Sequence, residues 1–274
     1  MDVLNGIDFE IRTGEVVALL GPNGAGKTTT IEILEGLRAR SAGRVSVLGT
    51  DPAHGDERWR ARIGIVLQSW QDHAKWRVRE LLHHLGAYYA PYATTEVPRP
   101  WDTAELIDLV GLTAQAGTRI SKLSGGQRRR LDVAIGLVGR PELLFLDEPT
   151  AGFDPKARRE FHELVHRLTD HERATVLLTT HDLAEAEKLA DRVLILADGQ
   201  IIADGSPGDL ALRMSAQAEV RWTVDGQRYV HPTGEATAFT RKLLAQYGEA
   251  VEDLEVRRAN LEDTYMSLVK EFEK

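Results

Sequence analysis

The stretch Gly21-Pro22-Asn23-Gly24-Ala25-Gly26-Lys27-Thr28 decides the fold, because it fits the pattern G-x-x-x-x-G-K-[ST] of phosphate-binding loops. It follows the apolar run 15–20, which predicts a buried strand, and it precedes a helical pattern that extends to about Leu37. Glycine lets the backbone turn its N–H groups toward a phosphate, and the helix N-terminus adds positive potential. The sequence therefore predicts that the loop, through Thr29, binds the phosphates of a nucleotide.

Four side chains give this site its expected chemistry. Lys27 is expected to reach the β- and γ-phosphates, and the Thr28 hydroxyl is expected to ligate Mg²⁺. Asp147 and Glu148 close a second apolar run, at a strand end that faces the ligand crevice of an open α/β sheet. Asp147 would hold Mg²⁺ through water, and Glu148 would polarise the attacking water as general base.

Short apolar runs predict an α/β core. The runs 15–20, 143–146 and 175–180 are typical of strands that are covered on both faces, as in a parallel sheet, and a helical pattern follows each of them. From about 70 to 140 the pattern is mainly helical and is interrupted by prolines. The predicted fold is a P-loop NTPase core with a mainly parallel sheet and an inserted helical subdomain, which together occupy residues 1–208.

A small α+β module is predicted for residues 209–274. Apolar and polar residues alternate over 220–224, and Asp225-Gly226 offers a two-residue hairpin turn. Apolar residues at helical spacing over 235–247 predict a helix, and Asn260 is a candidate N-cap for a last one. The module contains none of the residues of the phosphate site, so we expect it to be an accessory module that nucleotide chemistry does not need.

The composition excludes several classes of function. The net charge of −8 argues against a protein whose affinity for nucleic acid rests on broad phosphate neutralisation, so no nucleic-acid partner is expected. The chain has no cysteine, which excludes disulfides and thiolate metal sites and fits a reducing cytoplasm. No apolar run approaches the ~20 residues that span a bilayer, and the N-terminus does not resemble a secretory signal. A membrane role is therefore expected to depend on a partner chain.

The stretch Leu123-Ser124-Gly125-Gly126-Gln127, followed by a helical pattern, resembles the signature of ATP-binding cassette (ABC) proteins. Other elements occur in the order of that family across residues 14–205. Gln68 resembles the Q-loop glutamine, Ala151-Gly152-Phe153-Asp154 resembles the D-loop, and His181 resembles the switch histidine. The resemblance covers roughly the first three quarters of the chain, and it implies ATP and Mg²⁺ as the cofactors.

The resemblance also implies a head-to-tail dimer around two Mg-ATP. The signature residues 124–127 of one subunit would cap the γ-phosphate that Lys27 of the other subunit holds, and Asp154 would join the nucleotide contacts. Gln68 and His181 would sense that phosphate and the attacking water, and are therefore implied to be catalytic, with Gln68 also near Mg²⁺. Hydrolysis would remove the shared charge, and the dimer would open.

Three stretches resemble the branch of the family that exports drugs, antibiotics and polysaccharides: 136–140, 150–155 and 261–265. The resemblance implies an ATPase subunit that is peripheral on the cytoplasmic face of the cell membrane. It would power a separate transmembrane permease subunit, together with a second ATPase subunit that is either identical or different.

Two other functions compete with transport. One is a soluble cassette ATPase that acts on ribosomes or DNA, although this chain has a single cassette and no heptad run. The other is a truncated cassette with poor turnover. Relatives carry an adenine-stacking aromatic well before the phosphate loop, but only twenty residues precede Gly21 here, and Phe9 is expected in a strand. On this hypothesis the chain begins too late and binds ATP weakly.

Three further patterns have simpler interpretations. His162-Glu163-Leu164-Val165-His166 fits the zinc-protease motif H-E-x-x-H, but its position predicts a helix that covers the sheet. Arg128-Arg129-Arg130 is expected to be a solvated helix face, given the acidic total. Trp70 and Trp76 belong either to the core or to a groove that accepts a helix of the permease.

Overall fold

The computed structural model describes residues 3–66, 73–150, 153–172, 174–214, 218–257 and 265. The chain forms two compact units, Met1–Ile201 and Ile202–Lys274. The functional division expected between residues 1–208 and 209–274 stays a prediction.

The larger sheet has its described strands in the order β2-β3-β4-β1-β5-β6, and β1 to β5 form the core of the first unit. The neighbouring pairs β2–β3, β3–β4, β4–β1 and β1–β5 are parallel. The α/β fold with a mainly parallel sheet that the sequence predicts is therefore confirmed. The strands are β1 (Val16–Leu20), β2 (Ile63–Val66), β3 (Leu143–Asp147), β4 (Thr175–Thr180), β5 (Arg192–Ala197) and β6 (Gln200–Gly205).

The central strands are apolar because both of their faces are covered. Every residue of β1 and β4 is buried. On one face Val17, Phe145 and Leu177 join Ile31 in a single hydrophobic cluster. Phe9 packs against this cluster from a segment in which the described residues form no strand, so the strand expected there is wrong. Packing on the cluster, rather than pairing in the sheet, shields this ring.

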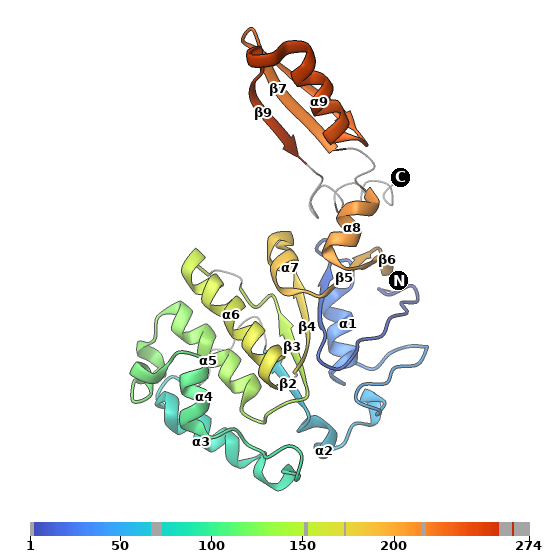
Figure 1. Ribbon diagram of the computed structural model, residues 1–274. Helices are drawn as coiled ribbons and strands as arrows, with labels where there is room; N and C mark the ends of the chain where they lie inside the picture. Colours follow the sequence, from blue (N-terminus) through green and yellow to red (C-terminus); the bar gives the residue numbers. More distant parts are fainter. Residues whose placement is uncertain are drawn as a thin grey trace. The chain divides into compact units, whose positions relative to one another are not determined.

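Helices connect the strands, and three of them form the inserted helical segment between β2 and β3. Helices α3, α4 and α5 contact one another, and α5 also contacts β2, so this group lies beside one edge of the sheet (Figure 1). The helices of the unit are α1 (Lys27–Leu34), α2 (Glu57–Arg60), α3 (Val78–Ala87), α4 (Thr103–Leu109), α5 (Gly125–Leu137), α6 (Pro155–Glu172) and α7 (Leu183–Leu189).

Short polar side chains start the three helices that follow the predicted functional segments. Ser124, Asp154 and Asp182 each accept hydrogen bonds from main-chain N–H groups in the first turn of α5, α6 and α7. These caps fix the point at which each loop ends. Each of these helices therefore has a defined first residue.

The second unit contains a three-stranded antiparallel sheet in the order β8-β7-β9, with α9 on one face. The turn Asp225-Gly226 has φ of 52° and 74°, as the predicted hairpin requires. Phe239 on α9 stacks on His231 and contacts Trp222. Of the last helix, expected from Asn260, only Tyr265 is described, and it is helical. The elements are α8 (Pro207–Met214), β7 (Ala218–Val224), β8 (Gln227–Thr233), α9 (Ala236–Tyr247) and β9 (Glu252–Arg257).

Candidate functional site

The phosphate loop joins the end of β1 to the start of α1, and its surroundings require its glycines. Gly24 and Gly26 have φ of 86° and 109°, in the left-handed region that favours glycine. A Cβ atom at Gly21 would lie 2.4 Å from the carbonyl oxygen of Leu196 on β5. Ala25, within the loop, is buried. The backbone conformation at Gly24 and Gly26 and the close approach of β5 to Gly21 therefore explain the glycines of the pattern.

The Lys27 amine is held against the loop. Its Nζ donates to the carbonyl oxygens of Gly21 at 2.6 Å and Pro22 at 3.1 Å, and the residue is 8% exposed. Burial lowers the pKa of Lys27, while the carboxylates of Glu148 and Asp147 oppose that shift. The loop thus presents a poorly hydrated cation, a setting that favours an anionic ligand.

A cavity of about 580 Å³ lies over the loop. It brings six of the nine loop residues predicted at 21–29 together with the acid pair at the end of β3, where an open α/β sheet places its ligands. None of the described residues that line it is aromatic. The lining consists of Val3, Asn23, Gly24, Gly26, Lys27, Thr28, Thr29, Asp147 and Glu148.

Thr179 on β4 orients the acid pair. Its hydroxyl donates to Asp147 Oδ1 at 2.5 Å. The Glu148 N–H donates at 3.1 Å to both the carbonyl and the hydroxyl oxygen of Thr179. Glu148 has a φ of 44°, which is strained for a residue with a Cβ atom. Thr179 is absent from the sequence-based predictions, and the available signal was a polar residue near the end of an apolar strand.

His181 follows β4 and reaches the predicted general base. Its Nδ1 lies 3.1 Å from Oε1 of Glu148. The histidine side chain is 66% exposed, whereas the glutamate side chain is 19% exposed. The structure therefore brings the predicted switch histidine and the predicted base together as a contacting pair.

The signature residues 124–127 are not among those that line this cavity. They form the exposed N-terminus of α5, where Ser124 and Gln127 each accept a hydrogen bond from the main-chain N–H of the other. A Cβ atom at Gly125 would meet no described atom within 4 Å, and one at Gly126 would meet Ala157 at 3.8 Å. The packing of this chain therefore does not itself require glycine at these two positions.

The remaining predicted residues are Asp154 and Gln68. The Asp154 carboxylate accepts the N–H groups of Ala157 at 2.8 Å and Lys156 at 2.9 Å, and these bonds hold its pKa below the usual range. It therefore caps α6, and its contact with a nucleotide stays a prediction. Gln68 lies outside the described residues, as does Trp70.

The predicted solvated face at residues 128–130 is wrong for Arg129. This residue is 7% exposed, and its guanidinium donates to the carbonyl oxygens of Pro149 at 2.9 Å and Asp147 at 3.2 Å. The other two arginines pair with acids on α5 and α6. Consecutive helical residues are about 100° apart around the axis, so a run of three cannot share one solvated face.

The residues of this cavity fit a magnesium–triphosphate group. The Thr28 hydroxyl and the Asp147 carboxylate are the hard oxygen donors that Mg²⁺ prefers. The loop backbone and the Lys27 amine suit phosphate. Among the described residues, no group of three or more His, Cys, Asp or Glu side chains could hold a metal ion. The other ligands of a Mg²⁺ at this site would come from phosphate oxygens, from water, or from Gln68, which stays a predicted ligand because it lies outside the described residues.

The H-E-x-x-H pattern lies on α6, between β3 and β4. His162 is 8% exposed, and burial lowers the pKa of its ring. His166 is exposed, while Phe161 and Leu164 are buried. The amphipathic helix expected at this position is therefore present, with His162 on its buried face and His166 on its exposed face.

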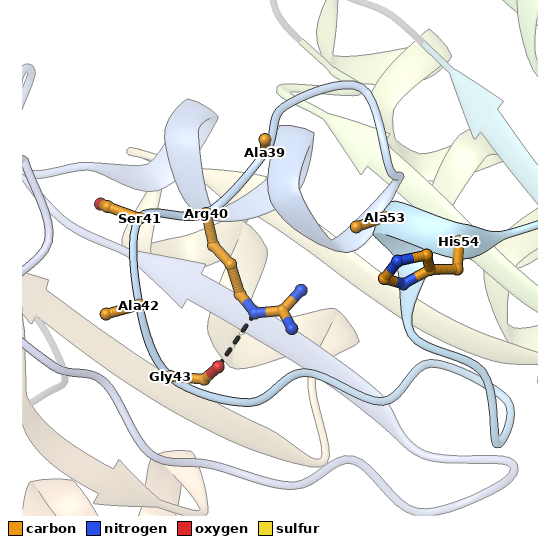
Figure 2. A pocket seen from close by; sticks show the side chains of 7 residues that line it. All are labelled: Ala39, Arg40, Ser41, Ala42, Gly43, Ala53 and His54. Atoms are coloured by element: carbon orange, nitrogen blue, oxygen red, sulfur yellow. Dashed lines mark hydrogen bonds between the residues drawn. The ribbon is translucent and has the colours of Figure 1, made fainter.

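A second hollow, of about 300 Å³, lies between residues 39–43 and the segment at Ala53 and His54 (Figure 2). Its one guanidinium, that of Arg40, donates to the Gly43 carbonyl and forms a two-fold hydrogen bond with the Asp51 carboxylate. The cation is thus neutralised by its own neighbours. This hollow shares no residue with the phosphate cavity, and we assign it no role.

The sequence matches the ABC transporter family over residues 4–151. The chain belongs to the ABC transporter family. Within that family, it is 43% identical to Nod factor export ATP-binding protein I of Neorhizobium galegae, over 75% of this chain and 58% of that protein. The chain therefore spans less than two thirds of the length of this relative.

Two resistance proteins cover more of the chain. The linearmycin resistance ATP-binding protein LnrL of Bacillus subtilis (strain 168) is 36% identical over 82% of this chain and 71% of that protein. The daunorubicin resistance ATP-binding protein DrrA2 of Streptomyces coeruleorubidus is 37% identical over 97% of this chain and 89% of that protein. The similarity to the export branch thus extends into the second unit.

Solved structures share the fold. An ATP-binding subunit of an ABC transporter aligns with a TM-score of 0.65 and 28% identity, over 77% of this chain and 86% of that one. A dimeric ATP-binding cassette in a post-hydrolysis state, bound to ADP and Pi, aligns with a TM-score of 0.63 and 25% identity, over 74% and 90%. In the described part of the present chain, no helix has both the length and the apolar character needed to cross a bilayer.

Proposed function

We propose that this chain binds Mg-ATP, pairs with a second ATPase subunit around two nucleotides, and hydrolyses them to drive a separate membrane permease. One observation carries the proposal: Lys27, Thr28, Asp147 and Glu148 line a single cavity. A cation, a hydroxyl and two carboxylates at the end of parallel strands suit phosphoryl transfer to water. The water oxygen bonds to the γ-phosphorus, the bond to the bridging oxygen breaks, and ADP leaves with that electron pair.

The loop residues bind and orient the phosphates. The backbone of residues 21–29 and the N-terminus of α1 would surround them, with Lys27 at the β- and γ-phosphates. Mg²⁺, bound by Thr28 and through water by Asp147, would neutralise the charge that develops on the phosphate oxygens. The 2.5 Å bond from Thr179 fixes the direction of that aspartate before any ligand arrives.

Glu148 is the group placed to polarise the attacking water. Its carboxylate lines the cavity and lies 3.1 Å from the ring of His181. That contact restricts the carboxylate, and it supports a role for the histidine beside the γ-phosphate. Gln68 is assigned to the same phosphate and to Mg²⁺ by its similarity to the family pattern.

The second subunit would complete each site. A Cβ at Gly125 would meet open space and one at Gly126 would make only an ordinary contact with Ala157, so the fold of one chain gives no reason for glycine. Close approach of an outside phosphate gives one, because the exposed N-terminus of α5 can bind an anion only if its backbone is accessible. Ser124 would cap the γ-phosphate held by the partner, and Asp154 would lie at the same interface.

The names of the relatives support export as the direction of transport. The Nod factor protein is named for export, and the two others are named for resistance to linearmycin and daunorubicin. We therefore assign this chain to an exporter, as a peripheral subunit on the cytoplasmic face of the cell membrane. The permease would be a separate polypeptide.

Mixing two inactive variants tests the proposal. Lys27→Ala damages the loop, and Ser124→Arg places a bulky cation at the signature. In a mixed head-to-tail dimer, both changes fall in one site and the other site is intact. A one-to-one mixture should therefore regain about a quarter of the parent ATPase activity, since half of the dimers have one good site of two.

The ATPase rate per chain should also rise with protein concentration, because the site needs two subunits. Two results would contradict the proposal: a parent chain without Mg-dependent ATPase activity, or a mixture that stays inactive while each variant still folds.

A further inference from the structure

The guanidinium of Arg129 contacts the segment that carries Glu148. Its Nε donates to the carbonyl oxygen of Pro149 at 2.9 Å, and its Nη2 donates to those of Asp147 at 3.2 Å and Glu148 at 3.4 Å. One guanidinium thus contacts the carbonyl groups of three successive residues. The planar fork of arginine suits this arrangement, whereas the ammonium of lysine is a single point of charge.

These carbonyl groups need a donor because the sheet ladder ends here. Asp147 is the last residue of β3, and Pro149 beyond it is buried. A buried carbonyl without a partner costs about 1–3 kcal/mol. Arg129 supplies charged donors at the place where strand pairing stops.

The charge of Arg129 is compensated within the fold. Burial lowers its pKa, and the carboxylates of Asp132, Asp147 and Glu185 oppose that shift. The attraction of these carboxylates keeps the buried guanidinium in position. Its hydrogen bonds therefore position the backbone of Asp147 and Glu148.

Glu148 is held from both sides of its Cα atom. Its N–H donates to Thr179, and its carbonyl oxygen accepts from Arg129. Between them lies the strained φ of 44°. Strained backbone persists only where the surroundings determine it. The backbone conformation of Glu148 sets the direction of its carboxylate. Loss of the hydrogen bond to Thr179 or of the one from Arg129 should therefore let the carboxylate change direction.

The same arginine belongs to the signature helix. It lies on α5 just over one turn after the capping residue Ser124. A capped helix moves largely as a rigid body, so a displacement of its N-terminus displaces the guanidinium. We propose, building on the function proposed above, that Arg129 is a positioning residue that couples the signature segment to Glu148 of the same chain. Through it, a nucleotide bound at the signature influences the base of the other site.

The test compares Arg129→Lys and Arg129→Gln with Arg99→Lys. Arg99 is the matched control, because it is also a buried arginine that donates to a backbone carbonyl, that of Ala61, and it bonds Glu142, which precedes β3. The first readout is kcat and KM for Mg-ATP. Arg129→Lys should lower kcat by about 10- to 100-fold, because a displacement of ~1 Å in a catalytic group has that effect, with little change in KM. Arg99→Lys should lower the melting temperature and leave kcat within about two-fold.

A double-mutant cycle separates positioning from general damage. In the Glu148→Gln background, the added Arg129→Lys change should alter the residual kcat by less than about two-fold, because the group that Arg129 positions is gone. An equal loss of kcat in both backgrounds would overturn the proposal. So would a kcat near that of the parent for folded Arg129→Lys. If Arg129→Gln does not fold, the lysine variant decides, since it keeps the charge and most of the volume.

Hydrogen exchange gives a readout that does not depend on activity. In Arg129→Lys, a peptide covering 147–150 should exchange about 10-fold faster than in the parent, while one covering 142–144 should not change. Arg99→Lys should show the reverse pattern. Unchanged exchange at 147–150 would overturn the proposal. Faster exchange there in a chain without ATPase activity would support the arrangement and refute the proposed function instead.

Discussion

The two ends of strand β3 carry the same kinds of side chain and use them differently. At the amino end, Glu142 accepts a two-fold hydrogen bond from Arg62, at 2.9 Å for each contact, and a further bond from Arg99 at 3.0 Å. At the carboxyl end, Asp147 and Glu148 face a cavity together with the amine of Lys27. The first end neutralises its charges within the fold, whereas the second gathers charges around an open space.

This difference separates stability from function along one strand. The bond from Arg62 is the main reason that the pKa of Glu142 lies below its usual range, so ionised Glu142 favours the folded state. At the other end the backbone of Glu148 is strained, and two acids lie side by side. Proteins commonly lose some folding stability to such strain and repulsion at functional sites. Three substitutions test the contrast, taken from the largest expected effect to the smallest.

Glu148→Gln should give the largest effect. The amide keeps the shape of the side chain but cannot accept the proton of the attacking water, so turnover should fall by about 100- to 10,000-fold. ATP binding should remain, and an ATP-bound dimer should accumulate, as size-exclusion chromatography with Mg-ATP would show. The control is Glu142→Gln at the other end of the strand, which should keep the parent turnover. Near-normal turnover in purified Glu148→Gln would refute the role of this carboxylate.

Glu142→Ala should lower stability without lowering turnover. It leaves the guanidinium of Arg99, whose side chain is 2% exposed, without its carboxylate. Because the Glu142 side chain is itself 35% exposed, solvent moderates the loss, and we expect about 1–3 kcal/mol in the free energy of unfolding. Urea unfolding at neutral pH measures it.

The sign of the pH dependence follows from the lowered pKa of Glu142. Its contribution is present above the ordinary carboxyl value of 4.5 and is lost as pH falls through the folded-state value. The gap in stability between parent and Glu142→Ala should therefore close in acid. A gap that stays constant down to pH 2 would show that lost packing, rather than the ion pairs, causes the effect.

Glu35→Gln should give a stability change of opposite sign, no larger than that of Glu142→Ala. Glu35 is 5% exposed at the end of α1, and burial, with the charges of Asp147 and Glu32, raises its pKa to about 7. The contribution of this acid to stability is complete below 4.5 and is lost as pH rises through about 7.

The glutamine variant, which cannot ionise, should therefore be more stable than the parent by about 1–3 kcal/mol at pH 8 and equal to it near pH 4. Thermal unfolding at both pH values, without nucleotide or metal, measures this. A variant that is less stable at pH 8 would show that the buried carboxylate has a partner that the amide cannot replace.

Local sequence determined the phosphate loop, the acid pair and the parallel strands. Gly24 and Gly26 need their left-handed backbone wherever the loop occurs, and a strand with both faces covered must be apolar throughout. Such requirements act over a few neighbouring residues, so a short stretch records them fully. The signature at residues 124–127 was found through its resemblance to the family pattern, and the reciprocal cap that the structure shows there is also local.

Only the tertiary structure decided which distant groups meet. Thr179 reaches Asp147 because β3 and β4 are neighbours in the sheet, and nothing near either residue records that pairing. Arg129 looked like one of three solvated arginines, and its burial became visible only once α5 was placed beside the end of β3. Helical residues turn by about 100° each, so the sequence fixes that these side chains diverge, but the packing of the helix decides which one points inward. Charge repeated along a chain is a local property, whereas the partner of each charge depends on contacts made across the fold.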